Sequence, residues 1–230
     1  MTTSLAEQLT TAIASLPPRR DTASFGASFV PALAYGRHRG PAPDGARRAA
    51  VAIAILERKD GSMFVPLTMR PQSLRHHGGQ VSLPGGKIES GESDLQAALR
   101  EFEEELGVPV KEPKFCGALP PLYLYTSDNI VSPIVLVSAA PTVPWQPDLF
   151  EVDRVIELPL EVLLSRKSPG HLSRQRRLMR GDETVGEFRF RAPVFRYDEH
   201  HVWGATAMLL GELGDLIGLV SSPSMSSMTG

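Results

Sequence analysis

The chain has 230 residues, a length that predicts one domain with extensions rather than two complete domains. Its 24 Lys and Arg nearly balance 26 Asp and Glu, and the net charge of −2 disfavours a surface for nonspecific nucleic-acid binding. The single cysteine, Cys116, excludes an intramolecular disulfide and a multi-cysteine zinc site. The N-terminus lacks a secretory-signal pattern, and Glu212 and Asp215 interrupt the longest apolar run. We therefore expect a globular cytoplasmic protein that does not span a membrane.

The first predicted element is a short amphipathic helix over 4–16, which ends at two prolines. Residues 31–45 are rich in Pro and Gly, a composition typical of an irregular linker. We accordingly expect residues 1–45 to form a helix and linker that pack on the core. Residues 46–220 form the main domain in this division, and residues 221–230 form a flexible tail.

In the main domain, two apolar runs at 49–56 and 63–69 flank an Asp-Gly turn and predict a β-hairpin. A helix is expected over 93–106, because Ser93 and Gln96 have capping-box spacing and Gly107 can end it. We expect further strands at 113–118, 121–125, 130–138 and 188–195, a strand and helical turn within 152–164, and a closing helix over 203–219. Strands interleaved with few helices favour an α+β or mixed α/β fold.

The helix over 93–106 carries three glutamates beside its apolar stripe, Glu101, Glu104 and Glu105. Like charges at these spacings repel one another. A solvated acidic face is the simpler interpretation. However, carboxylates are natural ligands of Mg²⁺ and Mn²⁺, and the preceding loop over 83–87 lets glycine backbone approach such an ion. The combination favours a divalent-metal site.

The stretch from Gly86 to Val108 resembles the Nudix box, G-x5-E-x7-R-E-U-x-E-E-x-G-U, in which U is a bulky apolar residue. Every fixed position is present, with Phe102 at the first U position. The resemblance implies the Nudix fold, an α/β/α sandwich with a mixed β-sheet between helices. It also implies metal-dependent hydrolysis of a nucleoside diphosphate linked to another moiety.

The same resemblance implies roles for individual residues. Glu101 and Glu105 would be metal ligands, Glu104 a third or water-bridged ligand, and the Gly85 carbonyl a further donor. Arg100 would orient the glutamates by ion pairing and complete the catalytic group, while Glu92 would tie the loop to the helix.

Residues 67–86, immediately before and into the box, read LTMRPQSLRHHGGQVSLPGG. They resemble the signature of coenzyme A pyrophosphatases, L-L-T-x-R-S-x-x-L-R-x-H-x-G-Q-V-S-F-P-G-G, with departures at Pro66, Pro71 and Leu83. Arginines there can bind phosphate through paired hydrogen bonds, and a solvated surface loop is the alternative. The candidate substrate-binding residues are Arg70, Arg75, His77 and Gln80. Segments 151–160 and 202–207 also resemble motifs of this branch.

The resemblance implies that Mg²⁺ or Mn²⁺ supports hydrolysis of coenzyme A and acyl-coenzyme A to 3′,5′-ADP and (acyl-)4′-phosphopantetheine. The expected partner is this small molecule, with no nucleic acid and no membrane, and a homodimer is left open. The alternatives are action on ADP-ribose, NADH or an oxidised nucleotide, or a non-catalytic ligand-sensing Nudix module.

Glu151, Trp203 and a basic cluster, all outside the box, have competing interpretations. Glu151 is either structural or an additional metal ligand or base. Trp203 is expected in the core, and a place near the substrate pocket is the alternative. The basic cluster of Arg174, Arg176, Arg177 and Arg180 is expected on a solvated hairpin that turns at 180–182, and contact with a substrate phosphate is the alternative.

Overall fold

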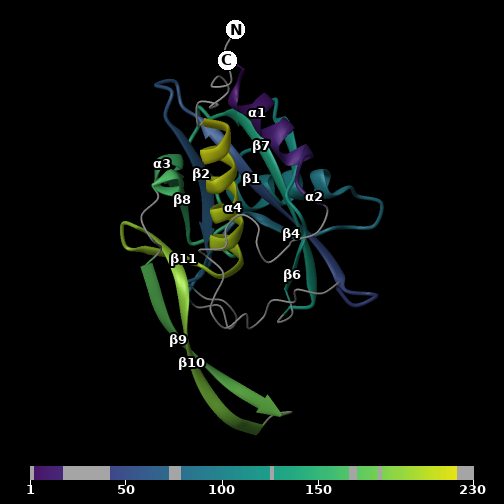
Figure 1. Ribbon diagram of the computed structural model, residues 1–230, viewed down its shortest axis with the longest axis vertical. Coiled ribbons are helices and arrows are strands. Elements are labelled where there is room, and N and C mark those ends of the chain that lie inside the picture. Colours follow the sequence, from purple (N-terminus) through teal and green to yellow (C-terminus); the bar gives the residue numbers. More distant parts are fainter. Residues whose placement is uncertain are drawn as a thin grey trace, which may run out of the picture.

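The computed structural model describes residues 3–17, 42–72, 79–124, 127–165, 170–180 and 183–221 (Figure 1). The elements in these residues follow one another as α1 (Leu5–Ala14), β1 (Arg47–Glu57), β2 (Met63–Met69), β3 (Val81–Ser82), β4 (Gly85–Lys87), α2 (Asp94–Leu106), β5 (Lys114–Ala118), β6 (Leu122–Leu124), β7 (Asn129–Ala139), β8 (Arg154–Pro159), α3 (Leu160–Leu164), β9 (Gly170–Arg180), β10 (Glu183–Tyr197), β11 (His200–Trp203) and α4 (Gly204–Ser221).

The main sheet is mixed. Its strand order is β3-β2-β1-β7-β5, with β8 also paired to β2, β4 to β1 and β6 to β7. Strands β1 and β7 run parallel along their whole lengths, whereas the other pairs are antiparallel. The predicted hairpin of β1 and β2 is confirmed, since Leu56 pairs with Phe64 across the Asp-Gly turn.

Helices cover both faces of this sheet, and β1 is therefore buried on both of its sides. Ile53 and Ile55 join a core with residues of α1, α3 and α4, while the alternate residues Ala52 and Ala54 join a second core with α2. Successive side chains of a strand point to opposite faces, so one apolar strand feeds two cores. Figure 1 shows α4 lying across the sheet. The predicted α/β/α sandwich is confirmed.

Helix α2 begins and ends at the residues that the sequence indicated. The Ser93 hydroxyl accepts from the Gln96 N–H at 3.3 Å, and the Gln96 side chain accepts from the Ser93 N–H at 2.9 Å. Gly107 has a left-handed φ of 68° and donates its N–H to the Glu103 carbonyl. This capping fixes the register at which the glutamates leave the helix.

A second sheet, β11-β10-β9, leaves the main body as a long ribbon of β9 and β10 (Figure 1). The closing helix begins at Gly204 and not at Trp203, because Trp203 pairs with Val194 as the last residue of β11. The predicted hairpin is present as β9 and β10, and within it Arg174 is only partly exposed because its guanidinium lies over the Trp203 ring. The turn at 181–182 lies outside the described residues.

Helix α4 is long and apolar enough to cross a membrane by length and composition alone, and 61% of it is buried inside the protein. Its Leu210 and Leu213 are fully buried in the core that also contains Leu9 of α1. Here α4 serves as a core helix.

Candidate functional site

The glycine pair at the start of the box brings the β4 backbone against α2. Gly85 and Gly86 pair with Val51 and Ala50 of β1. A Cβ on Gly86 would lie 2.4 Å from the Glu101 carboxyl carbon, and one on Gly85 would lie 2.3 Å from the Ala50 carbonyl oxygen. Both distances are far inside van der Waals contact. At Gly85 the obstacle is backbone, so only glycine permits the approach, whereas at Gly86 a larger residue would force the Glu101 carboxylate to move.

Arg100 ties the acidic side chains of the box together. Its guanidinium donates to Glu92 at 3.0 and 3.2 Å, to Glu101 and Glu104 at 2.9 Å each, and to the Lys87 carbonyl at 3.0 Å. The pairing with Glu92, followed by that with Glu101, raises the pKa of Arg100. The expected ion pairs of Arg100 are thus present, and they fix where the carboxylates stand.

The three glutamates of α2 differ in depth. Glu105 is 7% exposed, whereas the side chains of Glu101 and Glu104 are 16% and 59% exposed. Burial raises the pKa of Glu101, and Arg100 opposes that shift. Burial, and then the charges of Glu101 and Glu151, raises the pKa of Glu105 to about 7. Anions that are desolvated and crowded in this way favour a bound cation.

A further carboxylate, Glu151, comes from the loop before β8. Its charge raises the pKa values of both Glu101 and Glu105, which places it within electrostatic reach of both. The next two residues are anchored, since Val152 is 1% exposed and the Asp153 N–H donates to the carbonyl at the end of β2 at 2.8 Å. The structure therefore favours the functional interpretation of Glu151.

Strands β2 and β3 add a cation and a hydroxyl beside Glu105. The charge of Arg70, which follows β2, lowers the pKa of Glu105, as does a hydrogen bond from the Gly85 backbone. Thr68 is 1% exposed and its hydroxyl donates to Glu105 Oε2 at 3.4 Å. The same hydroxyl lies 3.2 Å from that of Ser82, its partner on β3.

This donor set fits a hard divalent cation. Mg²⁺ and Mn²⁺ bind carboxylate and carbonyl oxygens, and Glu101, Glu105, Glu151 and the Gly85 carbonyl offer both kinds. Among the described residues, no three His, Cys, Asp or Glu side chains lie close enough together to hold a metal ion in this conformation. Ion pairs with Arg100 instead draw the Glu101 and Glu104 carboxylates toward the guanidinium.

Of the predicted substrate-binding residues, Arg70 and Gln80 are described, whereas Arg75 and His77 lie outside the described residues. The Arg70 N–H donates to the Gln80 carbonyl at 3.1 Å, and the Gly79 N–H donates to the Arg70 carbonyl at 3.0 Å. The two ends of this loop therefore meet beside Glu105. The binding roles of all four residues stay predictions.

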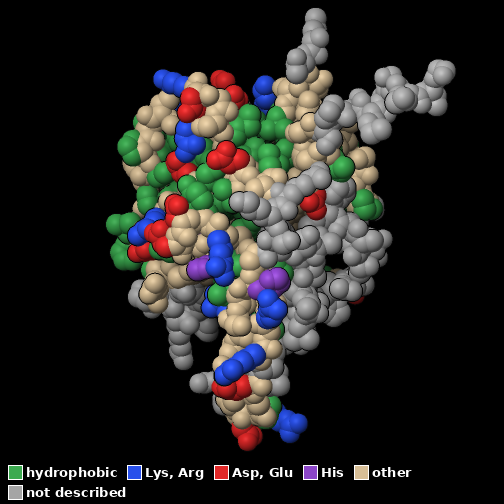
Figure 2. All heavy atoms as spheres, turned by 60° about the vertical axis from the view of Figure 1, so that its left-hand side comes forward, with side chains coloured by type: hydrophobic (Ala, Val, Ile, Leu, Met, Phe, Trp, Pro, Cys, Tyr) green, Lys and Arg blue, Asp and Glu red, His purple; other side chains and the backbone are tan. Residues whose placement is uncertain are grey.

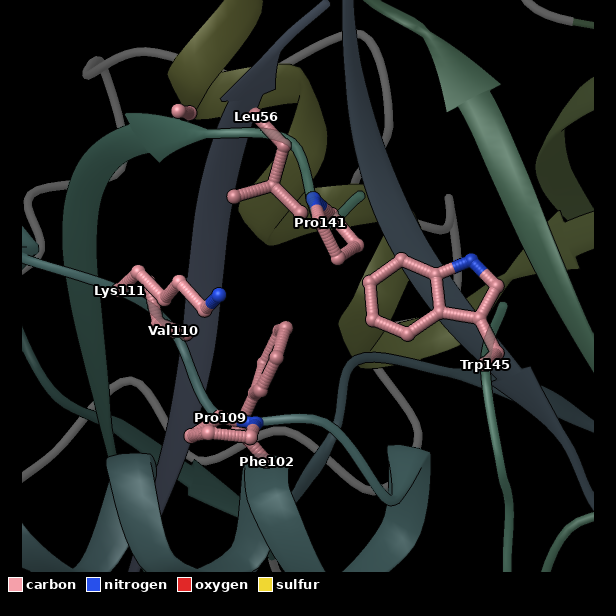
Figure 3. Close-up of a pocket in the computed structure, with 8 residues that line it drawn as sticks. Leu56, Phe102, Pro109, Val110, Lys111, Pro141 and Trp145 are labelled. Atoms are coloured by element: carbon pink, nitrogen blue, oxygen red, sulfur yellow. The ribbon is translucent and has the colours of Figure 1, made fainter. Parts of the chain in front are cut away.

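A small recess near the end of α2 is a packing feature. Figure 3 shows Phe102 and Trp145 on either side of it, with Lys111 at its edge. The remaining lining residues are Leu56, Pro109, Val110, Ala139 and Pro141. Lacking carboxylates, this lining offers no ligands for a divalent cation. Phe102 is 1% exposed, and its ring packs edge to face on that of Trp145, with 6.2 Å between the ring centres. This packing gives the aromatic residue within the box a structural role.

Two contributors to the site were not singled out from the sequence. Thr68 could have been noticed as the lone hydroxyl in an apolar strand, and Ser82 pairs with it only after β3 joins β2. Cys116 is buried, and burial raises the pKa of its thiol.

The family profile described as NUDIX domain matches residues 46–180. Nudix hydrolase NudL from Salmonella paratyphi B, named as uncharacterized, is 36% identical over 176 residues, which are 75% of this chain and 84% of that protein. NudL from Salmonella newport matches to the same extent. This chain belongs to the Nudix family. It is a Nudix diphosphatase by that membership, and its α2 glutamates stand in the family's box.

Solved structures of Nudix proteins also resemble this fold. The Nudix hydrolase RenU of M. smegmatis is 21% identical with a TM-score of 0.43, and covers 54% of this chain and 78% of its own. The MutT protein of Methanosarcina mazei is 23% identical with a TM-score of 0.42, and covers 55% of this chain and 87% of its own.

Proposed function

We propose that this Nudix hydrolase cleaves the diphosphate of coenzyme A and acyl-coenzyme A. The products are 3′,5′-ADP and (acyl-)4′-phosphopantetheine, and the cofactor is Mg²⁺ or Mn²⁺. The observation that carries the substrate assignment is the string over 67–86, which resembles the coenzyme A pyrophosphatase signature and leads directly into the metal loop. Its first cation, Arg70, acts electrostatically on Glu105, so the string begins at the carboxylate site.

Glu101 and Glu105 would hold the cation, with the Gly85 carbonyl and Glu104 as further donors. When bound, such an ion neutralises the diphosphate and lowers the pKa of a water molecule. Arg100 keeps Glu101 in position through their 2.9 Å ion pair. The Glu105 carboxylate accepts hydrogen bonds from the Thr68 hydroxyl and the Gly85 N–H, and these bonds hold it in place.

Hydrolysis also needs an acceptor for the proton of the attacking water. Glu151 suits this role, because its side chain comes from an exposed loop while its charge reaches both Glu101 and Glu105. The water oxygen bonds to phosphorus, its proton passes to Glu151, and the bridging oxygen leaves with the other product. Arg70 would bind the diphosphate through charge-assisted hydrogen bonds.

The test is a comparison of kcat/KM for coenzyme A, acetyl-coenzyme A, ADP-ribose, NADH and an oxidised nucleotide, each with Mg²⁺ and with Mn²⁺. We expect the two coenzyme A compounds to be the best substrates by at least tenfold. Faster hydrolysis of ADP-ribose or NADH would overturn the assignment of coenzyme A as the substrate. Hydrolysis of none of these compounds would favour a ligand-sensing module.

A further inference from the structure

The β11-β10-β9 sheet carries cations that the diphosphate site does not use. Directly opposed residues of antiparallel strands share one face. The register places Arg174 of β9, Arg196 of β10, and His201 and Trp203 of β11 on the same face. Figure 2 shows basic and histidine side chains gathered where this ribbon meets the body.

Arg174 is the least satisfied of these cations. Its guanidinium carbon lies 4.2 Å from the centre of the Trp203 ring, and its Nε is buried without a hydrogen-bond partner. Burial lowers its pKa, yet an arginine stays protonated at neutral pH. Within the described part of the chain it has no ion pair. A desolvated charge without a counter-charge is unfavourable, and an anionic ligand would remove that cost.

At the base of the ribbon, over 170–174 of β9 and 190–196 of β10, this face carries no carboxylate that could neutralise the cations. At the base of the ribbon the other residues on the face are Gly170, Leu172, Phe190, Ala192 and Val194. The Arg196 side chain reaches back over β9, since a Cβ on Gly170 would lie 3.1 Å from its Nε. Glu199, in the turn before β11, already pairs with Arg154 at 3.0 Å.

The sheet that carries the cationic face adjoins the diphosphate site. Strand β11 packs against β3, and β3 leads within three residues to Gly85 of the metal loop. The ion pair of Glu199 with Arg154 joins the same turn to the start of β8, directly after the loop that carries Glu151. A substrate whose diphosphate lies at Glu105 therefore has this sheet as a neighbour.

We propose that Arg174, stacked on Trp203 and flanked by Arg196 and His201, binds a phosphate monoester that the substrate carries in addition to its diphosphate. This rests on the proposed function, for which that group is the 3′-phosphate of coenzyme A. A guanidinium held over an indole ring presents its planar fork of donors to phosphate oxygens. Arg70, which acts on Glu105, is then left for the diphosphate itself.

The first test uses the ratio of kcat/KM for coenzyme A to that for dephospho-coenzyme A. Removal of a charge-assisted contact corresponds to about a ten- to hundredfold effect, so Arg174→Gln should lower the ratio by at least tenfold. The matched control is Arg189→Gln, which removes an exposed arginine from the opposite face of the same ribbon and should preserve the ratio. An unchanged ratio in Arg174→Gln would overturn the proposal. If that variant does not fold, Arg174→Lys, which keeps the charge but loses the planar fork, should still lower the ratio severalfold.

The second test measures binding without turnover. Calorimetric titration of 3′,5′-ADP and 5′-AMP into the wild type should give at least tenfold tighter binding of 3′,5′-ADP, and Arg174→Gln should abolish that preference. Equal affinities of the wild type for the two nucleotides would reject the phosphate site. Failure of the proposed function looks different, since the wild type would then hydrolyse another diphosphate and leave coenzyme A intact.

Discussion

Burial, hydrogen bonding and charge all act on the carboxyl group of Glu105. It is 7% exposed, accepts from Thr68, and has a pKa raised to about 7 by burial and by Glu101 and Glu151. In the unfolded chain the same carboxyl titrates near its ordinary value of 4.5. The folded protein thus holds this proton more tightly than the unfolded chain does.

Stability of the metal-free protein should therefore fall as pH rises from about 4.5 to about 7, and the contribution of Glu105 should be constant outside that window. The loss attributable to Glu105 is of the order of 3 kcal/mol. Urea unfolding in chelator between pH 5 and 8 measures it. Glu105→Gln should flatten the pH dependence, whereas Glu104→Gln, which removes an exposed carboxylate from the same helix, should keep it. An equally steep decline in Glu105→Gln would refute this assignment.

Catalytic turnover should need the same ionised carboxylates that destabilise the metal-free fold. Glu101→Gln and Glu105→Gln each remove a ligand charge, so we expect at least a hundredfold loss of kcat with the fold intact. Metal affinity, measured by Mn²⁺ titration, should fall as well. Normal kcat at saturating metal in either variant would show that the residue is not a ligand.

Arg70 differs from Arg174 in what it faces. Because the charge of Arg70 acts on Glu105, its partner on the substrate should be the diphosphate. Arg70→Ala should therefore lower kcat/KM for coenzyme A and for dephospho-coenzyme A equally, by about ten- to a hundredfold. A selective loss with coenzyme A alone would instead assign Arg70 to the 3′-phosphate.

At the scale of elements, the site depends on how closely β4 approaches α2. Gly86→Ala would place a methyl group 2.4 Å from the Glu101 carboxyl carbon, and that carboxylate, held by Arg100, would have to move. We expect a loss of activity and Mn²⁺ affinity of at least tenfold with a small change in melting temperature. Gly218→Ala, which meets no atom within 4 Å on α4, is the matched control and should leave activity unchanged. Wild-type Mn²⁺ affinity in Gly86→Ala would contradict the close approach.

Local patterns predicted α2 and the β1–β2 hairpin, since caps, turn residues and periodicity lie within a few residues of each other. Strands β3 and β4 were not predicted, because they are two and three residues long and exist only through pairing with β2 and β1. Strand β9 is rich in Arg and Gln and is defined by its partner β10. Likewise, the spacing of the α2 glutamates indicated a metal site, whereas the proximity of Glu151 and Thr68 to Glu105 depends on the assembled sheet.

At the scale of the whole molecule, α1 packs into the hydrophobic core of the main domain. Leu9 is fully buried, and Gly117 of β5 makes room for Ile13, which a Cβ there would meet at 2.7 Å. Leu9→Ala should lower the free energy of unfolding by about 2–5 kcal/mol. Thr11→Ala, at an exposed position of the same helix, is the control and should change it by less than 1 kcal/mol. Wild-type stability in Leu9→Ala would mean that α1 does not contribute to the core in solution.

The most direct test of the central claim is product analysis of coenzyme A hydrolysis before chelation, after exhaustive EDTA treatment, and after re-addition of Mg²⁺ or Mn²⁺. We predict that 3′,5′-ADP and 4′-phosphopantetheine form at rates that rise on the alkaline side of neutrality, that EDTA abolishes their formation, and that either cation restores it. Hydrolysis that continues undiminished after chelation would contradict a divalent-metal mechanism at the α2 glutamates.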